Sequence, residues 1–154
     1  DGARHRHRHE GPRVKDANCI FCKIVAGEAA ASIVHRDEHV VAFMDVSPVV
    51  EGHVLVIPAY HTAELAGVTD DAGARMFALG RRVAASLRAS GLPCEGINFF
   101  LADGVAAGQT VFHSHLHVIP RVRGDGLGFR HGLGRGRMSR LELDELASRL
   151  AARI

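Results

Sequence analysis

Short apolar-rich stretches recur along the chain, and one of them alternates histidines with other residues, patterns that are both typical of strands. Gly, Pro, Asn and Asp residues punctuate these stretches, as in the turns at Asp37-Glu38 and at Gly52. The pattern predicts five strands, over about 32–36, 39–45, 53–58, 96–101 and 111–119. Most of them are joined by short turns, which implies an antiparallel sheet with helices on one face and hence the α+β class.

Two longer stretches show apolar residues at helical spacing. The first predicts a helix over about 70–90, for which Thr69 or Asp70 provides the cap. The second predicts a final amphipathic helix over about 140–152, with Ser139 as its cap. The helices and strands together predict a single domain over residues 17–154.

Composition excludes several classes of protein. No apolar run approaches the roughly 20 residues that span a bilayer, so no membrane partner is expected. No apolar core of a signal peptide is present near the first residues, and the expected location is cytoplasmic. The net charge of +2 does not indicate a nucleic-acid partner. Residues 1–16 are rich in Arg and His without apolar periodicity, and we expect a flexible arm there.

A Cys-x-x-Cys pair lies in a short helix predicted from Asn18, its cap, through about Ala26. Cys19 and Cys22 point to metal or redox chemistry, and Cys94 to an ordinary thiol. Two thiolates are only half of a tetrahedral metal site. A redox pair would need a thioredoxin-like βαβ context, which the predicted strand order lacks.

Three histidines alternate with other residues in the last predicted strand. Residues two apart project from the same face about 6.6 Å from each other, so the rings of His113, His115 and His117 share a face. At that spacing two neighbouring rings can ligate one metal ion, but all three cannot easily do so. A division of labour among the three rings is therefore expected.

The segment that holds them, His113-Ser114-His115-Leu116-His117-Val118-Ile119, resembles the signature of the histidine triad superfamily, His-φ-His-φ-His-φ-φ with φ apolar. Four further segments are similar to the family in the same order: 19–28, 43–48, 52–58 and 108–111. The resemblance covers about residues 18–122 and is to bacterial-type members near the Hint branch. It implies a HIT-like fold with a five-stranded antiparallel sheet and two main helices. It also implies a homodimer whose sheets continue into one another.

The resemblance implies a nucleotidyl hydrolase or transferase that cleaves a purine nucleoside monophosphate (AMP or GMP) from a phosphoramidate or similar small leaving group. His115 is the nucleophile by position. An imidazole whose Nδ1–H is held by a backbone carbonyl presents its Nε2 lone pair to phosphorus, without need of a metal. Gln109, Thr110 and His117 are the implied phosphate contacts. Asp45 is the implied ribose contact, although without the resemblance a turn residue before Pro48 is the better interpretation.

An apolar purine slot is also implied, and plain core packing remains the alternative for each of its members. The slot residues are Ile20, Phe21, Ile24, Phe43 and Val46.

Metal-binding members of the family complete the cysteine pair with two histidines. Their positions correspond to His61 and His113, so the resemblance implies a closed, structural zinc site of Cys19, Cys22, His61 and His113. By the same likeness His53 lies near the triad as a supporting partner.

Two residues depart from the family pattern: Ser114, and Ala102, where many relatives carry an Asn that contacts phosphate. The missing Asn leaves the set of phosphate donors and the exact substrate open. Three other functions are alternatives: a dinucleoside polyphosphate hydrolase, a catalytically weak nucleotide-binding module, and a zinc-dependent hydrolase. The Gly/Arg-rich stretch 123–137 lacks the ending of a P-loop, and a solvated loop is expected there.

Overall fold

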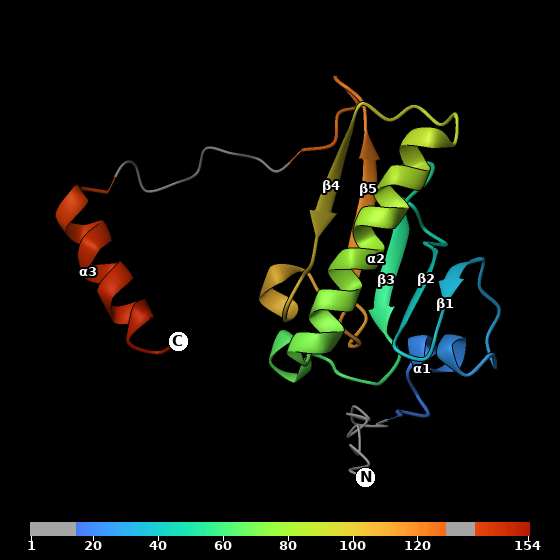
Figure 1. Ribbon diagram of the computed structural model, residues 1–154, viewed down its shortest axis with the longest axis horizontal. Coiled ribbons are helices and arrows are strands. Elements are labelled where there is room, and N and C mark those ends of the chain that lie inside the picture. The colour runs from blue at the N-terminus through green and yellow to red at the C-terminus, as the bar shows by residue number, and fades with distance from the viewer. Residues whose placement is uncertain (1–14, 129–137) are drawn as a thin grey trace, which may run out of the picture.

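The five strands form one antiparallel sheet in the order β1-β2-β3-β5-β4 (Figure 1). The computed structural model describes residues 15–128 and 138–154. Its helices and strands are α1 (Ile20–Val25), β1 (Ile33–Arg36), β2 (Val40–Met44), β3 (Val54–Pro58), α2 (Asp70–Ala89), β4 (Gly96–Phe100), β5 (Leu116–Arg121) and α3 (Arg140–Ala151). The predicted α+β class and the five-stranded antiparallel sheet are confirmed.

Helix α2 covers one face of this sheet (Figure 1). The side chain of Thr69 caps it by accepting from the amide of Ala72, as predicted. At Gly80 an added Cβ would lie 3.1 Å from side-chain atoms of Leu116 and Phe99, so the glycine permits close approach of the helix to β4 and β5. The core between helix and sheet consists of Val40, Ala42, Val54, Val56, Met76, Leu79, Val83, Leu87 and Val118.

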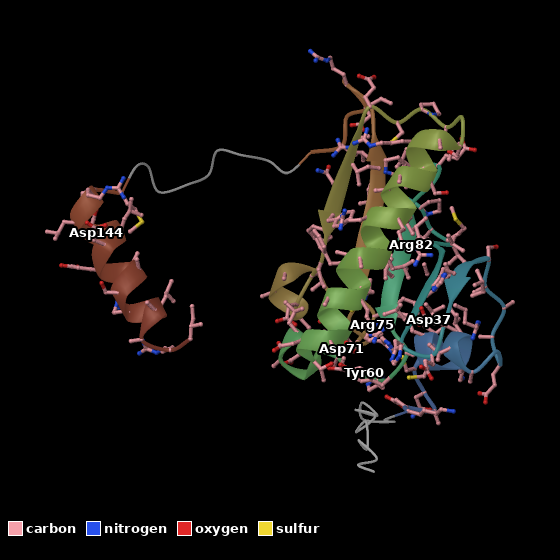
Figure 2. The ribbon with its side chains drawn as sticks, viewed as in Figure 1. Asp37, Tyr60, Asp71, Arg75, Arg82 and Asp144 are labelled. Atoms are coloured by element: carbon pink, nitrogen blue, oxygen red, sulfur yellow. The ribbon has the colours of Figure 1, made fainter. Side chains whose placement is uncertain are left out.

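The segment between β3 and α2 is held by Tyr60, which lies near the start of the helix (Figure 2). The Tyr60 hydroxyl donates to the carbonyl of Gly67 at 3.0 Å and accepts from the amide of Thr69 at 2.9 Å. One helical turn further along, Arg75 pairs with Asp71 at 2.8 Å on the exposed side of α2. The short helix α1 and the histidines lie on the opposite face of the sheet from α2.

Helix α1 packs against that opposite face, so the expectation that the helices lie on one face is wrong, because β2 and β3 are apolar on both faces. Its cap is Cys19, whose side chain accepts from the amide of Cys22, so the prediction that Asn18 caps the helix is wrong by one residue. The guanidinium of Arg36 on β1 donates to the carbonyl of Ile24 at 3.0 Å and to that of Val25, at the end of the helix where carbonyls lack partners within it. The core on this side consists of Cys19, Phe21, Cys22, Ile24, Val41, Phe43, Leu55 and Ile57.

Strand β5 begins five residues later than predicted, at Leu116, and ends at Arg121. His113 and His115 therefore precede the strand, and only His117 belongs to it. The register pairs Leu116 with Val56, so Ser114 would stand opposite Pro58, which has no amide hydrogen to donate. The amide of Ser114 instead donates to the carbonyl of Thr62 at 2.6 Å.

Helix α3 is capped by Ser139 in a capping box with Glu142, and it buries none of its residues. In Figure 1 it lies away from the sheet. Most of the predicted arm (1–14) and part of the predicted Gly/Arg-rich loop (129–137) lie outside the described residues. Among the residues described, no helix combines the length and the hydropathy that crossing a bilayer requires.

Candidate active site and metal centre

His115 is buried beneath α1, and its ring is fixed by a single backbone contact. Its Nδ1 lies 2.8 Å from the carbonyl oxygen of His113, which can only accept, so Nδ1 carries the hydrogen. The edge of the Phe21 ring packs against the imidazole with centroids 5.3 Å apart. With the hydrogen on Nδ1, the lone pair of the imidazole form is on Nε2, the atom that can attack an electrophile.

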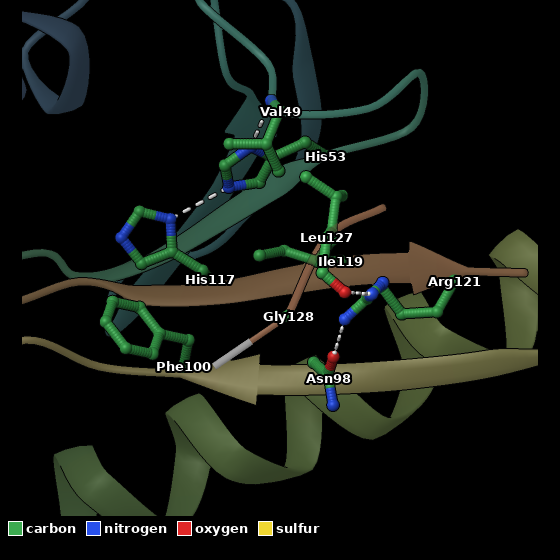
Figure 3. Close-up of a pocket in the computed structure, with 9 residues that line it drawn as sticks. All are labelled: Val49, His53, Asn98, Phe100, His117, Ile119, Arg121, Leu127 and Gly128. Atoms are coloured by element: carbon green, nitrogen blue, oxygen red, sulfur yellow. Dashed lines mark hydrogen bonds between the residues drawn. The ribbon is translucent and has the colours of Figure 1, made fainter. Parts of the chain in front are cut away.

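His117 lies beside His115, with ring centroids 4.8 Å apart, and contacts His53, the residue before β3. Nε2 of His53 lies 2.8 Å from Nδ1 of His117, and the amide of Val49 donates to Nδ1 of His53 at 3.2 Å (Figure 3). Burial lowers the pKa of His117 to about 4 and also lowers the pKa of His53. Both rings are therefore neutral at pH 7.

Four potential metal ligands converge between α1 and the segment before β5. The donor atoms of Cys19, Cys22, His61 and His113 all lie within 4.8 Å of one another. Sγ of Cys19 lies 3.5 Å from Nδ1 of His113, and Sγ of Cys22 lies 3.4 Å from Nδ1 of His61 and 3.6 Å from Nδ1 of His113. A tetrahedral zinc ion with ordinary Zn–S and Zn–N bonds separates sulfur and nitrogen by about 3.5 Å. The donor set thus fits zinc.

The outer contacts of this cluster also suit a metal site. Nε2 of His113 donates to the carbonyl of Pro58 at 2.9 Å, which leaves the Nδ1 lone pair facing the sulfurs. A carboxylate oxygen of Asp16 lies 3.8 Å from Nε2 of His61. Burial lowers the pKa of His113 to about 4, so its ring is in the neutral form that ligates metals.

Gln109 has a different role from the one predicted. Its amide nitrogen donates to the carbonyls of Ala63 at 2.7 Å and Val111 at 3.1 Å, and its oxygen accepts from the amide of Gly104 at 2.8 Å. Because both amide hydrogens are used, the expected contact with phosphate is replaced by a structural role in the loop before the triad. Thr110 is exposed and its hydroxyl is accessible to a ligand.

Asp45, the predicted ribose contact, follows directly after β2. Its contacts suit both a turn residue and a residue of the site. One carboxylate oxygen accepts from the amide of Ser47 at 2.8 Å, as expected of a turn residue. The other lies 3.5 Å from Nδ1 of His53, which places the carboxylate beside the histidine cluster.

The five predicted purine-slot residues divide into two groups. Phe21, Ile24 and Phe43 are buried in the core under α1, so core packing accounts for them. Ile20 and Val46 are exposed, Val46 to 91%, and core packing does not explain them. These two side chains are the ones free to contact a planar base.

A cavity of about 250 Å³ adjoins His53 and His117 (Figure 3). Apolar side chains of Val49, Phe100, Ile119 and Leu127 form much of its wall. Its one cation among the lining residues, Arg121, donates to both carboxylate oxygens of Asp125 at 2.6 Å, and also to Asn98 and to the carbonyl of Leu127.

Sequence reasoning missed two parts of this region. The contact of Val49 is made by its backbone amide, so no side-chain type at that position could reveal it. The pairing of Arg121 with Asp125 had a weak indication in the four-residue spacing of opposite charges, but that spacing is common on any surface.

Comparisons with known proteins agree with this geometry. The family model described as HIT domain matches residues 26–124. The protein named Protein hit from Bacillus subtilis (strain 168) is 45% identical over 112 residues, which are 72% of this chain and 77% of that protein.

Two solved structures are similar in fold and sequence. A Zn-bound histidine triad family protein from Mycobacterium smegmatis is 44% identical, with a TM-score of 0.69 over 86% of this chain and 97% of that one. A histidine triad nucleotide-binding protein from Candida albicans is 30% identical, with a TM-score of 0.77 over 88% of this chain and 96% of that one. The Zn-bound neighbour and the Cys/His cluster together indicate structural zinc.

Proposed function

Because the chain belongs to the HIT domain family, we propose that it is an enzyme that cleaves a purine nucleoside monophosphate, AMP or GMP, from a small leaving group through a covalent intermediate on His115. Family membership supports a nucleotide-binding hydrolase or transferase. The observation that carries the finer proposal is the hydrogen bond of His115 Nδ1 to the carbonyl of His113, because it leaves Nε2 as the only nucleophilic atom of the ring.

The proposed reaction has two steps. Nε2 of His115 attacks the α-phosphorus and a P–N bond to the histidine forms. The bond from phosphorus to the leaving group breaks, and the leaving group keeps the bonding electron pair and takes a proton from solvent. His117 and the hydroxyl of Thr110 donate to the phosphate oxygens as negative charge accumulates on them. Water then attacks the same phosphorus and gives up a proton to solvent. The bond to His115 breaks with its electron pair returning to Nε2, so the nucleoside monophosphate is released and the histidine is regenerated.

Base and ribose are bound on the α1 side in this proposal. Ile20 and Val46 make apolar contacts with the purine. The buried Phe21, Ile24 and Phe43 form the core beneath them. Asp45 accepts from the ribose hydroxyls, a role for which a carboxylate with four acceptor sites is suited. Ile20 and Val46 are exposed and lie outside the core, so they can be substituted to test these contacts without loss of core packing.

The cavity beside His117 favours a phosphoramidate or a similar leaving group over a polyphosphate. A polyphosphate chain carries several negative charges and needs cations to receive them. Asp125 already neutralises Arg121, whose hydrogen atoms are directed to protein acceptors. The apolar wall of Phe100, Ile119 and Leu127 is suited to an uncharged group instead.

We propose that Cys19, Cys22, His61 and His113 bind a structural zinc ion. Four protein ligands leave no open position for water or substrate, so the ion would stabilise the fold and would not take part in the chemistry. Cysteines can bind a metal only while they are reduced, and a reducing compartment keeps them so. This is consistent with the expected cytoplasmic location.

We also propose a homodimer formed through strand β4. Two strands end the sheet, and β1 is the less suitable edge because its register shifts between Ile33 and His35, an irregularity that discourages pairing. Strand β4 pairs in regular register with β5 along its whole length and leaves its other edge open. Beside it the Phe77 ring is 57% exposed and packs edge-on against Phe99.

A panel of substrates tests the proposed function. The kcat/KM values of an AMP phosphoramidate, an AMP alkyl ester and a diadenosine polyphosphate are compared for wild type and His115→Ala. We expect the phosphoramidate to be preferred and His115→Ala to lose at least about 10⁴-fold. His35→Ala, which removes a histidine from edge strand β1, is the matched control and should retain activity. Equal hydrolysis by wild type and His115→Ala would refute the proposal, and a preference for the polyphosphate would select the alternative.

A further inference from the structure

The backbone amide of Val49 determines the tautomer of His53. It lies in the turn between β2 and β3, where its hydrogen points at Nδ1 of His53 at an N···N distance of 3.2 Å. An amide N–H only donates, so Nδ1 must hold a lone pair and the single hydrogen of the neutral ring must be on Nε2. His53 is 2% exposed and has little freedom to turn away from this contact.

The tautomer of His53 in turn determines that of His117. Nε2–H of His53 points at Nδ1 of His117 at 2.8 Å, so Nδ1 of His117 accepts and its hydrogen is on Nε2. Figure 3 shows one nitrogen of the His117 ring directed at His53 and the other directed away from it. The nitrogen directed away is the one that carries the hydrogen.

Asp45 opposes this arrangement. Its Oδ2 lies 3.5 Å from the same Nδ1 of His53 and would favour a hydrogen on that atom. The Val49 amide meets the geometric requirements of a hydrogen bond and lies closer, whereas the carboxylate lies beyond ordinary hydrogen-bond distance. With the Val49 amide removed, the carboxylate would draw the hydrogen to Nδ1 and reverse both tautomers.

A metal ion is the competing explanation for this cluster, because donor atoms of Asp45, His53 and His117 lie within 4.8 Å of one another. The hydrogen bonds argue against it. The lone pair of His53 Nδ1 faces an amide hydrogen, and that of His117 Nδ1 faces the hydrogen of His53. The lone pairs that a metal would require are therefore already used.

We propose that the Val49 amide, acting through His53, sets His117 in the Nε2–H tautomer, so that His117 offers a hydrogen-bond donor to the phosphate. The tautomer assignment stands on geometry alone, and only its consequence for phosphate binding rests on the proposed function. His53 is then a positioning residue. Its role is to decide whether His117 presents a hydrogen or a lone pair to substrate.

Two-bond ¹H–¹⁵N NMR spectra of the zinc-loaded full chain at pH 7 test this assignment, since they distinguish protonated from unprotonated ring nitrogens. We expect Nδ1 unprotonated and Nε2 protonated in both His53 and His117. A hydrogen on Nδ1 of either ring would overturn the proposal. This measurement needs no variant, so it decides the matter even if every substitution fails to fold.

A matched pair of variants tests the cause. Val49→Pro removes the amide hydrogen, and Val49→Ala keeps it while shortening the same side chain. We expect His117 to change to the Nδ1–H form in Val49→Pro only, with kcat for the phosphoramidate reduced about 100-fold. A folded Val49→Pro variant with both tautomers unchanged would overturn the proposal. If wild type hydrolyses no nucleotide substrate, the proposed function fails, and the spectra still decide the tautomers.

Discussion

The carbonyl oxygen of His113 accepts the Nδ1–H of His115 at 2.8 Å, so the backbone of one triad histidine orients the ring of the next. The side chain of His113 meanwhile joins the cysteine cluster through Nδ1 and donates to the carbonyl of Pro58 through Nε2. One residue thereby connects the proposed zinc ion, strand β3 and the proposed nucleophile. We expect that loss of the metal changes the orientation of the His115 ring only by moving the backbone carbonyl of His113.

Removing a zinc ligand should weaken the fold. Cys22→Ser replaces a thiolate with a poor zinc ligand, and we expect zinc content to fall below about half an ion per chain. The free energy of unfolding should fall by about 3 kcal/mol, which lowers Tm by roughly 6–12 °C for a chain of this size. Metal analysis and thermal unfolding measure both quantities.

Cys94→Ser is the matched control for that variant. Its sulfur donates to the carbonyl of Gly96 and lies outside the cluster, so zinc content should be unchanged. Full zinc content in Cys22→Ser would contradict the proposed site. Loss of turnover on chelation without a fall in Tm would indicate a catalytic metal in place of a structural one.

Replacing Ser114 should stabilise the protein. Its hydroxyl is buried without a hydrogen-bond partner, and the family pattern has an apolar residue at this position. Ser114→Ala removes the unsatisfied group, and we expect the free energy of unfolding to rise by about 1 kcal/mol, or Tm by roughly 2–4 °C. Ser47→Ala, at an exposed turn, should leave Tm unchanged. A lower Tm for Ser114→Ala would show that the hydroxyl has a partner after all.

Stability should fall with acidification because of His117. Burial lowers its pKa from the usual 6.5 to about 4 in the folded chain. Between these two values the unfolded chain binds more protons, so the free energy of unfolding decreases as the pH falls from 6.5 towards 4. Urea unfolding of wild type and His117→Gln, in saturating zinc at about pH 7 and about pH 5, measures this. We expect wild type to lose more stability than the variant, and an equal loss in both would contradict the lowered pKa.

The proposed dimer should depend on Phe77. Phe77→Glu places a charge on the exposed aromatic surface beside β4, and burying that charge in an interface is unfavourable. We expect sedimentation to show a dimer for wild type and a monomer for Phe77→Glu. Leu65→Glu changes an apolar residue of similar exposure in the turn before α2, and it should remain dimeric. A monomeric wild type, or a dimeric Phe77→Glu, would contradict the β4 interface.

The sheet and the long helix could be predicted from the sequence because their patterns are local. The continuous apolar runs of β2 and β3, and the apolar spacing and Thr69 cap of α2, each depend on residues within a few positions. The start of β5 could not be predicted in this way. Histidine alternation continues through His113 and His115, but the pairing strand ends at Pro58, and that limit depends on a register set by distant residues.

The site was predictable in its residue types and less so in its contacts. The triad and the cysteine pair are visible in the sequence, and the structure brings Cys19, Cys22, His61 and His113 together. Gln109 was assigned to phosphate, yet its side chain bonds two backbone groups of its own loop and the carbonyl of Ala63 before α2. The contact of Val49 with His53 is made by a backbone amide, which every residue except proline possesses.

The covalent intermediate gives the most direct test of the central claim. Wild type is mixed with an AMP phosphoramidate and quenched in denaturant at alkaline pH within one turnover, and peptides are mapped by mass spectrometry. The proposed mechanism predicts one AMP group on the peptide that holds the triad, located on His115, formed and lost at rates consistent with kcat. His115→Ala should show no adduct and no turnover. Turnover without an adduct, or an adduct on His117 in place of His115, would contradict the mechanism.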